Sequence, residues 1–171
     1  MEHHSEKKSF PPFHPTLQGC VVRDQRFARA LEESYLEELY AISAYVYRSL
    51  LTAGHNKALS ELFEELAKDE MRHFRLLGEL ILALGGNPTI CTQLRVGSPD
   101  GMGNSCAPTC RGTSRMVSDS LREEKRGIDR YQTLMGRTQD RVVRSVISHI
   151  LSDEHRHVEE LCAAEKLSYG K

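Results

Sequence analysis

Two short stretches of this sequence combine acidic and histidine side chains at helical spacing. Residues 69–73 and 153–157 both read Asp-Glu-x-Arg-His. In each stretch the glutamate and the histidine are three residues apart, and residues at that spacing are neighbours on one face of a helix. Carboxylate oxygen and imidazole nitrogen together suit divalent transition metals. The pattern therefore predicts one pair of metal ligands on each of two helices. The pairs are Glu70 with His73 and Glu154 with His157.

A second internal repeat contributes two further carboxylates. The stretches that begin at Glu37 and Glu123 both read Glu-Glu, six further residues and then Tyr. A duplicated pattern of this kind implies that the two halves are related by a pseudo-twofold axis. Four carboxylates would balance the charge of two divalent cations, so we expect a site for two metal ions. The predicted ligands are Glu38, Glu70, His73, Glu124, Glu154 and His157.

Each of these glutamates interrupts a stripe of apolar residues at three- and four-residue spacing. On the second predicted helix, for example, Leu66 precedes Glu70, and Leu77 follows His73. An unpaired ionised carboxylate loses several kcal/mol of solvation in a core. No lysine or arginine lies on these stripes to pair with all four glutamates. The alternative, exposed salt-bridge residues on ordinary helices, does not explain why apolar neighbours flank the glutamates on the same face.

The prolines indicate which elements position these residues. Proline is absent between Thr16 and Asn87 and again after Pro108, and two stretches free of proline are able to form long helices. Polar turns around Gly54 and Gly136 divide each stretch in two. Alternation typical of strands is missing. We therefore expect an all-α four-helix bundle of two antiparallel hairpins joined by a long crossover. The predicted helices are 24–52, 57–84, 114–135 and 140–166.

The positions of the turns test the metal site independently. Two residues of an antiparallel hairpin lie at the same height when they are equally far from its turn. Gly54 lies midway in sequence between Glu38 and Glu70. Gln139 lies midway between Glu124 and Glu154. The turns are assigned from their glycines and polar residues, not from the carboxylates. That each turn nevertheless lies midway between two glutamates supports one shared layer of ligands.

With this ligand pattern, the sequence resembles the ferritin-like di-metal carboxylate proteins, and rubrerythrins and bacterioferritins in particular. The resemblance covers roughly residues 24–166 and rests on the two Glu positions and the two Glu-x-x-His pairs. It implies a ferritin-like bundle that binds two iron ions, with Glu70 and Glu154 as bridging carboxylates. It also implies an oxidoreductase that reacts with O₂ or H₂O₂, of the rubrerythrin-like peroxidase or ferroxidase type.

Further residues are expected to support the ligands. A ligating histidine usually donates its second ring N–H to a carboxylate, and Asp69 and Asp153 are candidates to reach the histidine of the opposite hairpin. Arg72 and Arg156 are candidates to hold those aspartates. Two tyrosines follow Glu38 and Glu124 by seven residues, and we expect them to hydrogen-bond the ligand carboxylates or to donate an electron. These candidate catalytic residues are Tyr45 and Tyr131.

Two departures from the rubrerythrin pattern leave other functions open. Typical rubrerythrins carry a further glutamate three residues after the third-helix ligand, where this sequence has Gly127. The chain also shows no pair of Cys-x-x-Cys motifs for a rubredoxin module, so electrons are expected from an external donor or from Fe(II) itself. The alternatives are a dimanganese catalase-like enzyme and a non-catalytic protein for iron binding or storage. The sequence does not distinguish iron from manganese, since both accept these ligands.

The composition of the chain bears on its class of function, its domain organisation and its cellular compartment. The chain has 171 residues and a net charge of −1, which favours a globular protein that binds neither nucleic acid nor membrane. Residues 1–20 are expected to form a loose arm and residues 21–171 one bundle, with 85–112 as an irregular crossover. Five scattered cysteines and the absence of an apolar leader favour the cytoplasm. Cys91, Cys106 and Cys110 are most simply loop thiols.

Apolar residues off the inward stripes bear on assembly. Tyr40, Tyr47 and Phe74 fall partly outside the predicted core positions. Large apolar side chains on an outer face are typical of an interface, so we expect a homodimer or a larger homo-oligomer.

Overall fold

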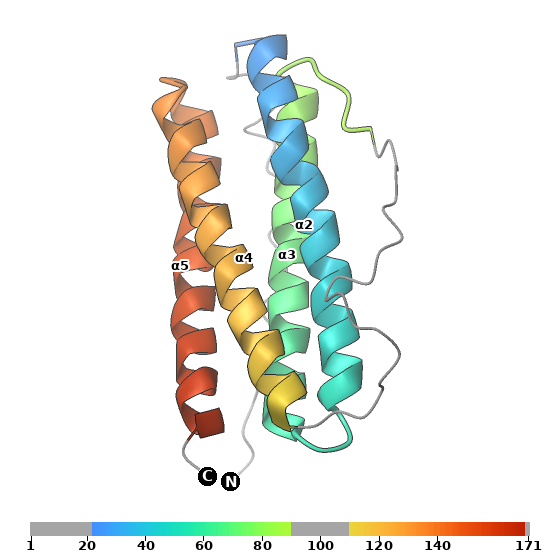
Figure 1. The fold of residues 1–171 in the computed structure, drawn as a ribbon. Coiled ribbons are helices and arrows are strands. Elements are labelled where there is room, and N and C mark those ends of the chain that lie inside the picture. The colour runs from blue at the N-terminus through green and yellow to red at the C-terminus, as the bar shows by residue number, and fades with distance from the viewer. Residues whose placement is uncertain (1–21, 90–109, 170–171) are drawn as a thin grey trace, which may run out of the picture.

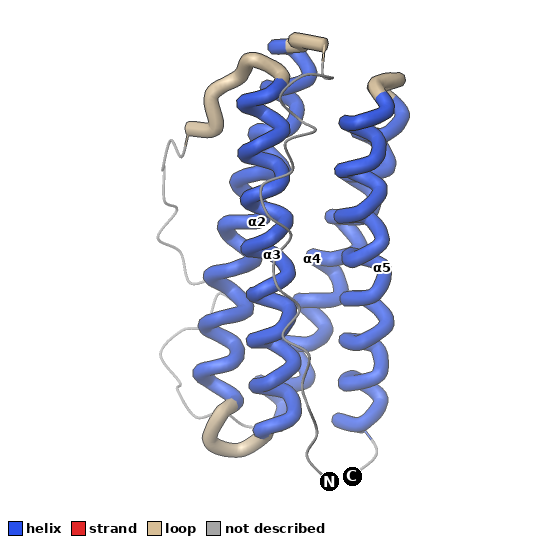
Figure 2. The backbone as a smooth tube through the Cα atoms, turned by 180° about the vertical axis from the view of Figure 1, so that it is seen from behind, coloured by secondary structure: helices blue, strands red, loops and turns tan. Residues whose placement is uncertain are grey.

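The computed structural model describes residues 22–89 and 110–169, which form four long α-helices. They pair into two hairpins that stand side by side as a bundle (Figures 1 and 2). Within the described residues there is no strand. The predicted all-α four-helix bundle is therefore confirmed. The helices are α2 (Gln25–Thr52), α3 (Lys57–Ala83), α4 (Cys110–Gly136) and α5 (Arg141–Tyr169).

Side-chain caps fix where three of the helices begin. The Asp24 carboxylate accepts hydrogen bonds from the backbone N–H groups of Arg26 and Phe27 at the start of α2. Asn56 accepts one from Leu59 N at the start of α3, and Asp140 accepts two at the start of α5. These oxygens satisfy N–H groups that have no partner inside the helix, which is why short polar residues define these starts.

The helix boundaries differ from the predicted ones mainly in the second hairpin. Helix α4 begins at Cys110, four residues before the predicted start, because Gly112 is accommodated within its first turn. A glycine inside a helix costs only about 1 kcal/mol relative to alanine. Helix α5 continues to Tyr169, beyond the predicted end. The predicted N-terminal arm and residues 90–109 of the crossover, with Cys91 and Cys106, lie outside the described residues.

The apolar core consists of two clusters, one toward each end of the bundle. One cluster contains Tyr35, Leu77 and Ile150, and the other contains Tyr45, Leu66 and Leu161, each among further residues. Along α3 the two clusters are separated by Glu70 and His73, and along α5 by Glu154 and His157. A polar layer therefore lies across the middle of the bundle.

The predicted inward stripes agree closely with the observed burial. The predicted stripe of the second helix runs from Leu59 to Leu84 and that of the fourth from Ile147 to Leu161, and every position in both is buried. The exceptions on the other two helices are half-buried: Ile42, Ile128 and Met135. Among the described residues, no helix combines the length and apolarity that a membrane span requires.

Candidate metal centre

All six predicted ligands are buried and meet in the polar layer between the two hairpins. Each ligand residue is at most 4% exposed. All six lie between the two apolar clusters and are members of neither. Their ligand atoms form two groups in which all atoms lie within 4.8 Å of one another. The first group is Glu38, Glu70, His73 and Glu154, and the second is Glu70, Glu124, Glu154 and His157. Both groups are able to hold a metal ion, and they share Glu70 and Glu154.

The two histidines direct the same ring atom toward the carboxylates. His73 Nδ1 lies 2.9 Å from Glu70 Oε2 and 3.4 Å from Glu154 Oε1. His157 Nδ1 lies 3.2 Å from Glu70 Oε1 and 3.3 Å from Glu124 Oε2. The ring centroids are 5.8 Å apart. The Nδ1 atoms are therefore the candidate ligand atoms, one for each group.

The opposite ring nitrogens contact aspartates of the other hairpin. His73 Nε2 lies 3.3 Å from Asp153 Oδ2, and His157 Nε2 lies 3.3 Å from Asp69 Oδ2. When a neutral imidazole donates its Nε2–H to the aspartate, its Nδ1 carries no proton. The Nδ1 lone pair then faces the glutamates and is able to bind a metal ion. This arrangement sets the orientation of both imidazoles and links α3 with α5.

The two arginines contact these aspartates unequally. Arg156 Nη2 donates hydrogen bonds to Asp69 Oδ2 at 2.6 Å and to Asp153 Oδ1 at 2.9 Å, so one guanidinium spans both hairpins. Arg72 forms an ion pair with Asp69 of its own helix. Both arginines are partly exposed, which places them at the outer edge of the polar layer.

Two buried tyrosines contact ligand carboxylates across the hairpins. The Tyr45 hydroxyl donates to Glu124 Oε1, and the Tyr131 hydroxyl donates to Glu38 Oε1. Burial is the main cause of raised pKa values for both phenols, so both remain protonated donors at neutral pH. Each tyrosine therefore fixes a glutamate that belongs to the opposite hairpin.

Sequence reasoning missed one buried charge near this layer. Arg48 is 1% exposed, its Nη1 donates to Glu123 Oε2 at 3.0 Å, and its guanidinium lies 5.6 Å from the centre of the Tyr45 ring. The position could have been found from its spacing, because Arg48 follows Tyr45 by three residues on the inward face. The corresponding residue after Tyr131 is Leu134, so the repeat is not symmetric here.

Gly127 lies directly against one shared carboxylate. A Cβ atom at this position would stand 3.1 Å from Glu154 Oε2. A larger side chain would therefore press on the carboxylate. The glycine therefore allows Glu154 to occupy its observed position.

Burial and mutual contacts shift the pKa values of the carboxylates and imidazoles in this layer. Burial, together with repulsion from Glu70, raises the pKa of Glu38 to about 8 and raises the pKa of Glu154 as well. Burial alone would lower the pKa of His157, but its contacts with Glu124 and Glu70 raise it to about 10. Burial alone would raise the pKa of Glu70, yet close contacts with Glu38 and the two histidines lower it. Ionised Glu70 is thus surrounded by protonated groups at neutral pH.

These shifts predict that the metal-free protein loses stability as the pH rises. A group whose pKa is higher in the folded state stabilises the fold below its unfolded pKa, and this contribution disappears as the pH passes the folded value. That loss occurs between pH 4.5 and about pH 8 for Glu38, and between pH 6.5 and about pH 10 for His157, because the pKa values of these groups rise over those ranges on folding. We expect the melting temperature of the metal-free chain, measured with a chelator, to fall by several degrees between these pH values. A constant or rising melting temperature would contradict the protonated layer.

Comparison with known proteins agrees with this geometry. Residues 28–166 match the family model described as a ferritin-like domain, which is most of the chain. The chain belongs to the ferritin-like family. A search of the curated proteins finds no match to this sequence. The family assignment confirms the resemblance seen in the sequence at the level of the superfamily.

The centre of this ferritin-like chain fits a metal pair on structural grounds. Glu70 Oε1 is buried and makes no hydrogen bond, although His157 Nδ1 is only 3.2 Å away. A buried carboxylate oxygen without a hydrogen bond is costly, and a cation would compensate it. Four carboxylates and two imidazoles also suit two divalent ions in both charge and donor type.

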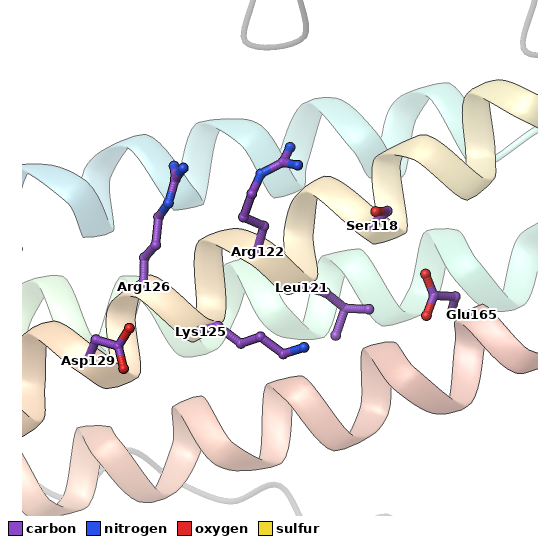
Figure 3. A pocket seen from close by; sticks show the side chains of 7 residues that line it. All are labelled: Ser118, Leu121, Arg122, Lys125, Arg126, Asp129 and Glu165. Carbon is purple, nitrogen blue, oxygen red and sulfur yellow. The ribbon is translucent and has the colours of Figure 1, made fainter.

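The pocket drawn in Figure 3 is separate from this centre. It has a volume of about 450 Å³, and its lining comes from α4 and from one residue of α5. The lining residues are Ser118, Leu121, Arg122, Lys125, Arg126, Asp129 and Glu165. The six candidate ligands are not among them, so the ferritin-like centre is a buried cluster rather than the floor of this pocket.

Proposed function

We propose that this ferritin-like protein binds two iron ions and acts as an oxidoreductase that reacts with O₂ or H₂O₂. The observation that carries this proposal is the pair of overlapping four-residue groups buried between the hairpins. A structural site for one ion would need only one such group. Two groups that share two carboxylates would hold two ions close together, and a pair of iron ions would supply two electrons to one oxidant molecule.

The proposed ligand assignment follows the two groups. One ion would be held by Glu38 and His73, and the other by Glu124 and His157, with Glu70 and Glu154 bridging. An iron pair in this position would supply electrons for reduction of a small oxidant. The ions could instead be manganese, because the donor set accepts both metals.

The surrounding residues of the chain have definable roles in this proposal. Asp69 and Asp153 would hold the two imidazoles with Nδ1 facing the ions, and Arg156 would keep both aspartates in place. Tyr45 and Tyr131 would hold Glu124 and Glu38, so that these carboxylates keep their orientation while the shared ones move. The apolar clusters on both sides exclude bulk water from the layer.

Gly127 would help to keep a shared carboxylate in position. A Cβ atom at residue 127 would stand 3.1 Å from Glu154 Oε2, so a side chain there would press on this carboxylate. Rubrerythrin-type switching onto an additional glutamate is not part of the proposal, because the chain has glycine at that position.

Turnover under controlled metal loading tests the proposed activity. The chain would be loaded anaerobically with Fe(II), mixed with excess Fe(II) and O₂ or H₂O₂, and followed by the absorbance of Fe(III). We expect many equivalents to be oxidised per chain, and we expect Glu154→Gln to lose this turnover. Glu159→Gln is the matched control, because Glu159 is an exposed residue of the same helix.

Each other outcome identifies a different function. Oxidation that stops after the bound ions would contradict an enzyme and support iron binding or storage. Activity with Mn(II) and H₂O₂ but not with Fe(II) would support the catalase-like alternative. The reducing cytoplasm and an external electron donor remain parts of the proposal, and the free thiol of Cys162 is compatible with the former.

A further inference from the structure

The outer face of α4 carries an excess of positive charge. Among the described side chains of this helix, Asp129 is the one exposed anion, whereas four exposed side chains are cations. These cations are Arg115, Arg122, Lys125 and Arg126. On each of the other three helices, exposed lysines and arginines balance exposed aspartates and glutamates to within one charge. A chain with a net charge of −1 therefore gathers much of its exposed positive charge on one helix face.

Ion pairs on α4 compensate only part of this charge. Asp119 pairs with Arg122 and lies 3.7 Å from Arg115 Nε, yet the side chains of these arginines are 57% and 68% exposed. No carboxylate in the described part of the chain lies within ion-pair distance of Lys125 or Arg126. Both of these cations are therefore available to the carboxylates of a partner.

The surface is hollowed at the same place. Arg122, Lys125 and Arg126 line the pocket of about 450 Å³, and Figure 3 shows the two arginines and the lysine extending from different sides of α4. Leu121, which is 6% exposed, adds an apolar wall. The lining contains three cations and two anions, so a protruding acidic side chain of a partner would fit this hollow.

This face lies directly outside the candidate metal centre. Lys125 follows the predicted ligand Glu124, and Arg126 precedes Gly127, which contacts the shared carboxylate of Glu154. The thickness of one helix, about 10–12 Å with its side chains, therefore separates a partner on this face from the ligand carboxylates. Electrons tunnel between protein redox groups over separations of this size.

We propose that the face of α4 around Arg122, Lys125 and Arg126 is the docking site of an acidic electron-carrier protein. This inference rests on the proposed function and names the class of its electron donor. Reduction of one H₂O₂ consumes two electrons and two protons and yields two water molecules. Two reduced one-electron carriers would each be oxidised once, and the protons would come from solvent. A basic face steers a negatively charged carrier to this side of the bundle and speeds association.

Binding to an acidic [2Fe–2S] ferredoxin tests the docking site without any turnover. With the Mn(II)-loaded chain at low ionic strength, we expect measurable binding that weakens as salt is added. The double variant Lys125→Glu, Arg126→Glu should weaken this binding by more than about tenfold, because two attractions become repulsions. Its helical circular dichroism and metal content should not change, since both side chains are exposed.

A matched control separates a docking site from a general effect of net charge. The double variant Lys57→Glu, Lys68→Glu changes the net charge by the same amount, and both residues are exposed on α3. It should leave the affinity for the ferredoxin within about twofold of the wild-type value. Equal weakening in the two double variants would overturn the proposal.

Cross-linking locates the contact. A carbodiimide joins a lysine amine to a touching carboxylate as an amide, with loss of water, and Lys125 is the one lysine in the pocket lining. We expect Lys125→Arg, which keeps the charge, to bind the ferredoxin but to lose most of the cross-linked product. Lys68→Arg should keep that product. A product that is unaffected by Lys125→Arg would place the partner elsewhere and contradict the proposal.

Two further results would overturn the docking site. One is a wild-type chain that does not bind the ferredoxin at low ionic strength. The other is tighter binding to a DNA duplex or to anionic vesicles than to the ferredoxin, which would assign the basic face to a different partner. Binding of the ferredoxin without any turnover would contradict the proposed function alone. Turnover with Fe(II) as the electron source, without ferredoxin binding, would contradict the docking site alone.

Discussion

Replacement of Glu70 by glutamine is expected to abolish the binding of both metal ions. Glu70 belongs to both four-residue groups, and its two oxygens lie 2.9 Å from His73 Nδ1 and 3.2 Å from His157 Nδ1. Glutamine keeps the size of the side chain but removes the negative charge and one of the two carboxylate oxygens. Residues that only orient a ligand typically contribute 10–100-fold in affinity, so loss of a shared ligand should exceed about 100-fold.

Elemental analysis after anaerobic loading and desalting measures this effect. The wild-type chain should retain two ions, and the Glu70→Gln variant should retain none. Glu65→Gln is a suitable control because Glu65 is an exposed residue of the same helix, paired with Lys68 on the surface. Two ions retained by the Glu70→Gln variant, with unchanged affinity, would exclude Glu70 as a shared ligand.

Metal loading is expected to raise the melting temperature by the largest amount of any single treatment. A ligand at 1,000 times its dissociation constant stabilises the folded state by about 4 kcal/mol per site. For a chain of this size, 1 kcal/mol corresponds to roughly 2–4 °C, so one site alone should add roughly 8–16 °C. The physical reason is that the folded chain brings four carboxylates and two imidazoles together around the cations, whereas the unfolded chain does not.

Calorimetry with and without Mn(II), which avoids oxidation during heating, provides the measurement. The increase should disappear in the Glu70→Gln variant and persist in the Glu65→Gln variant. An increase of the same size in the Glu70→Gln variant would place the stabilising ion elsewhere on the chain.

The sequence predicted which glutamates and histidines lie together because the relevant distances are local. Glu70 and His73 are neighbours on one helical turn, and the turn at Gly54 brings Glu38 to the same height. Burial on α3 and α5 followed directly from the three- and four-residue spacing of apolar residues. Such inferences need only the geometry of one helix or one hairpin.

Contacts that depend on how the two hairpins face each other could not be predicted from the sequence in the same way. The sequence predicted that Tyr45 contacts a ligand carboxylate but not which one, and its hydroxyl donates to Glu124 of the other hairpin. The buried pair of Arg48 and Glu123 also joins the two hairpins. Seven residues along a helix move a side chain about 10 Å along its axis, so the partner had to come from elsewhere. A pattern within one helix does not contain that information.

The division of the core by a polar layer also determines how the two hairpins align along their length. If one hairpin slid by a single helical turn of about 5.4 Å, the carboxylates would face leucine and isoleucine side chains. The cross-hairpin contacts of Asp69, Asp153 and Arg156 would be lost at the same time. A uniformly apolar interface would tolerate such a shift far better, because one leucine replaces another at little cost. The layer thus selects a single longitudinal register, much as a buried polar residue does in a coiled coil.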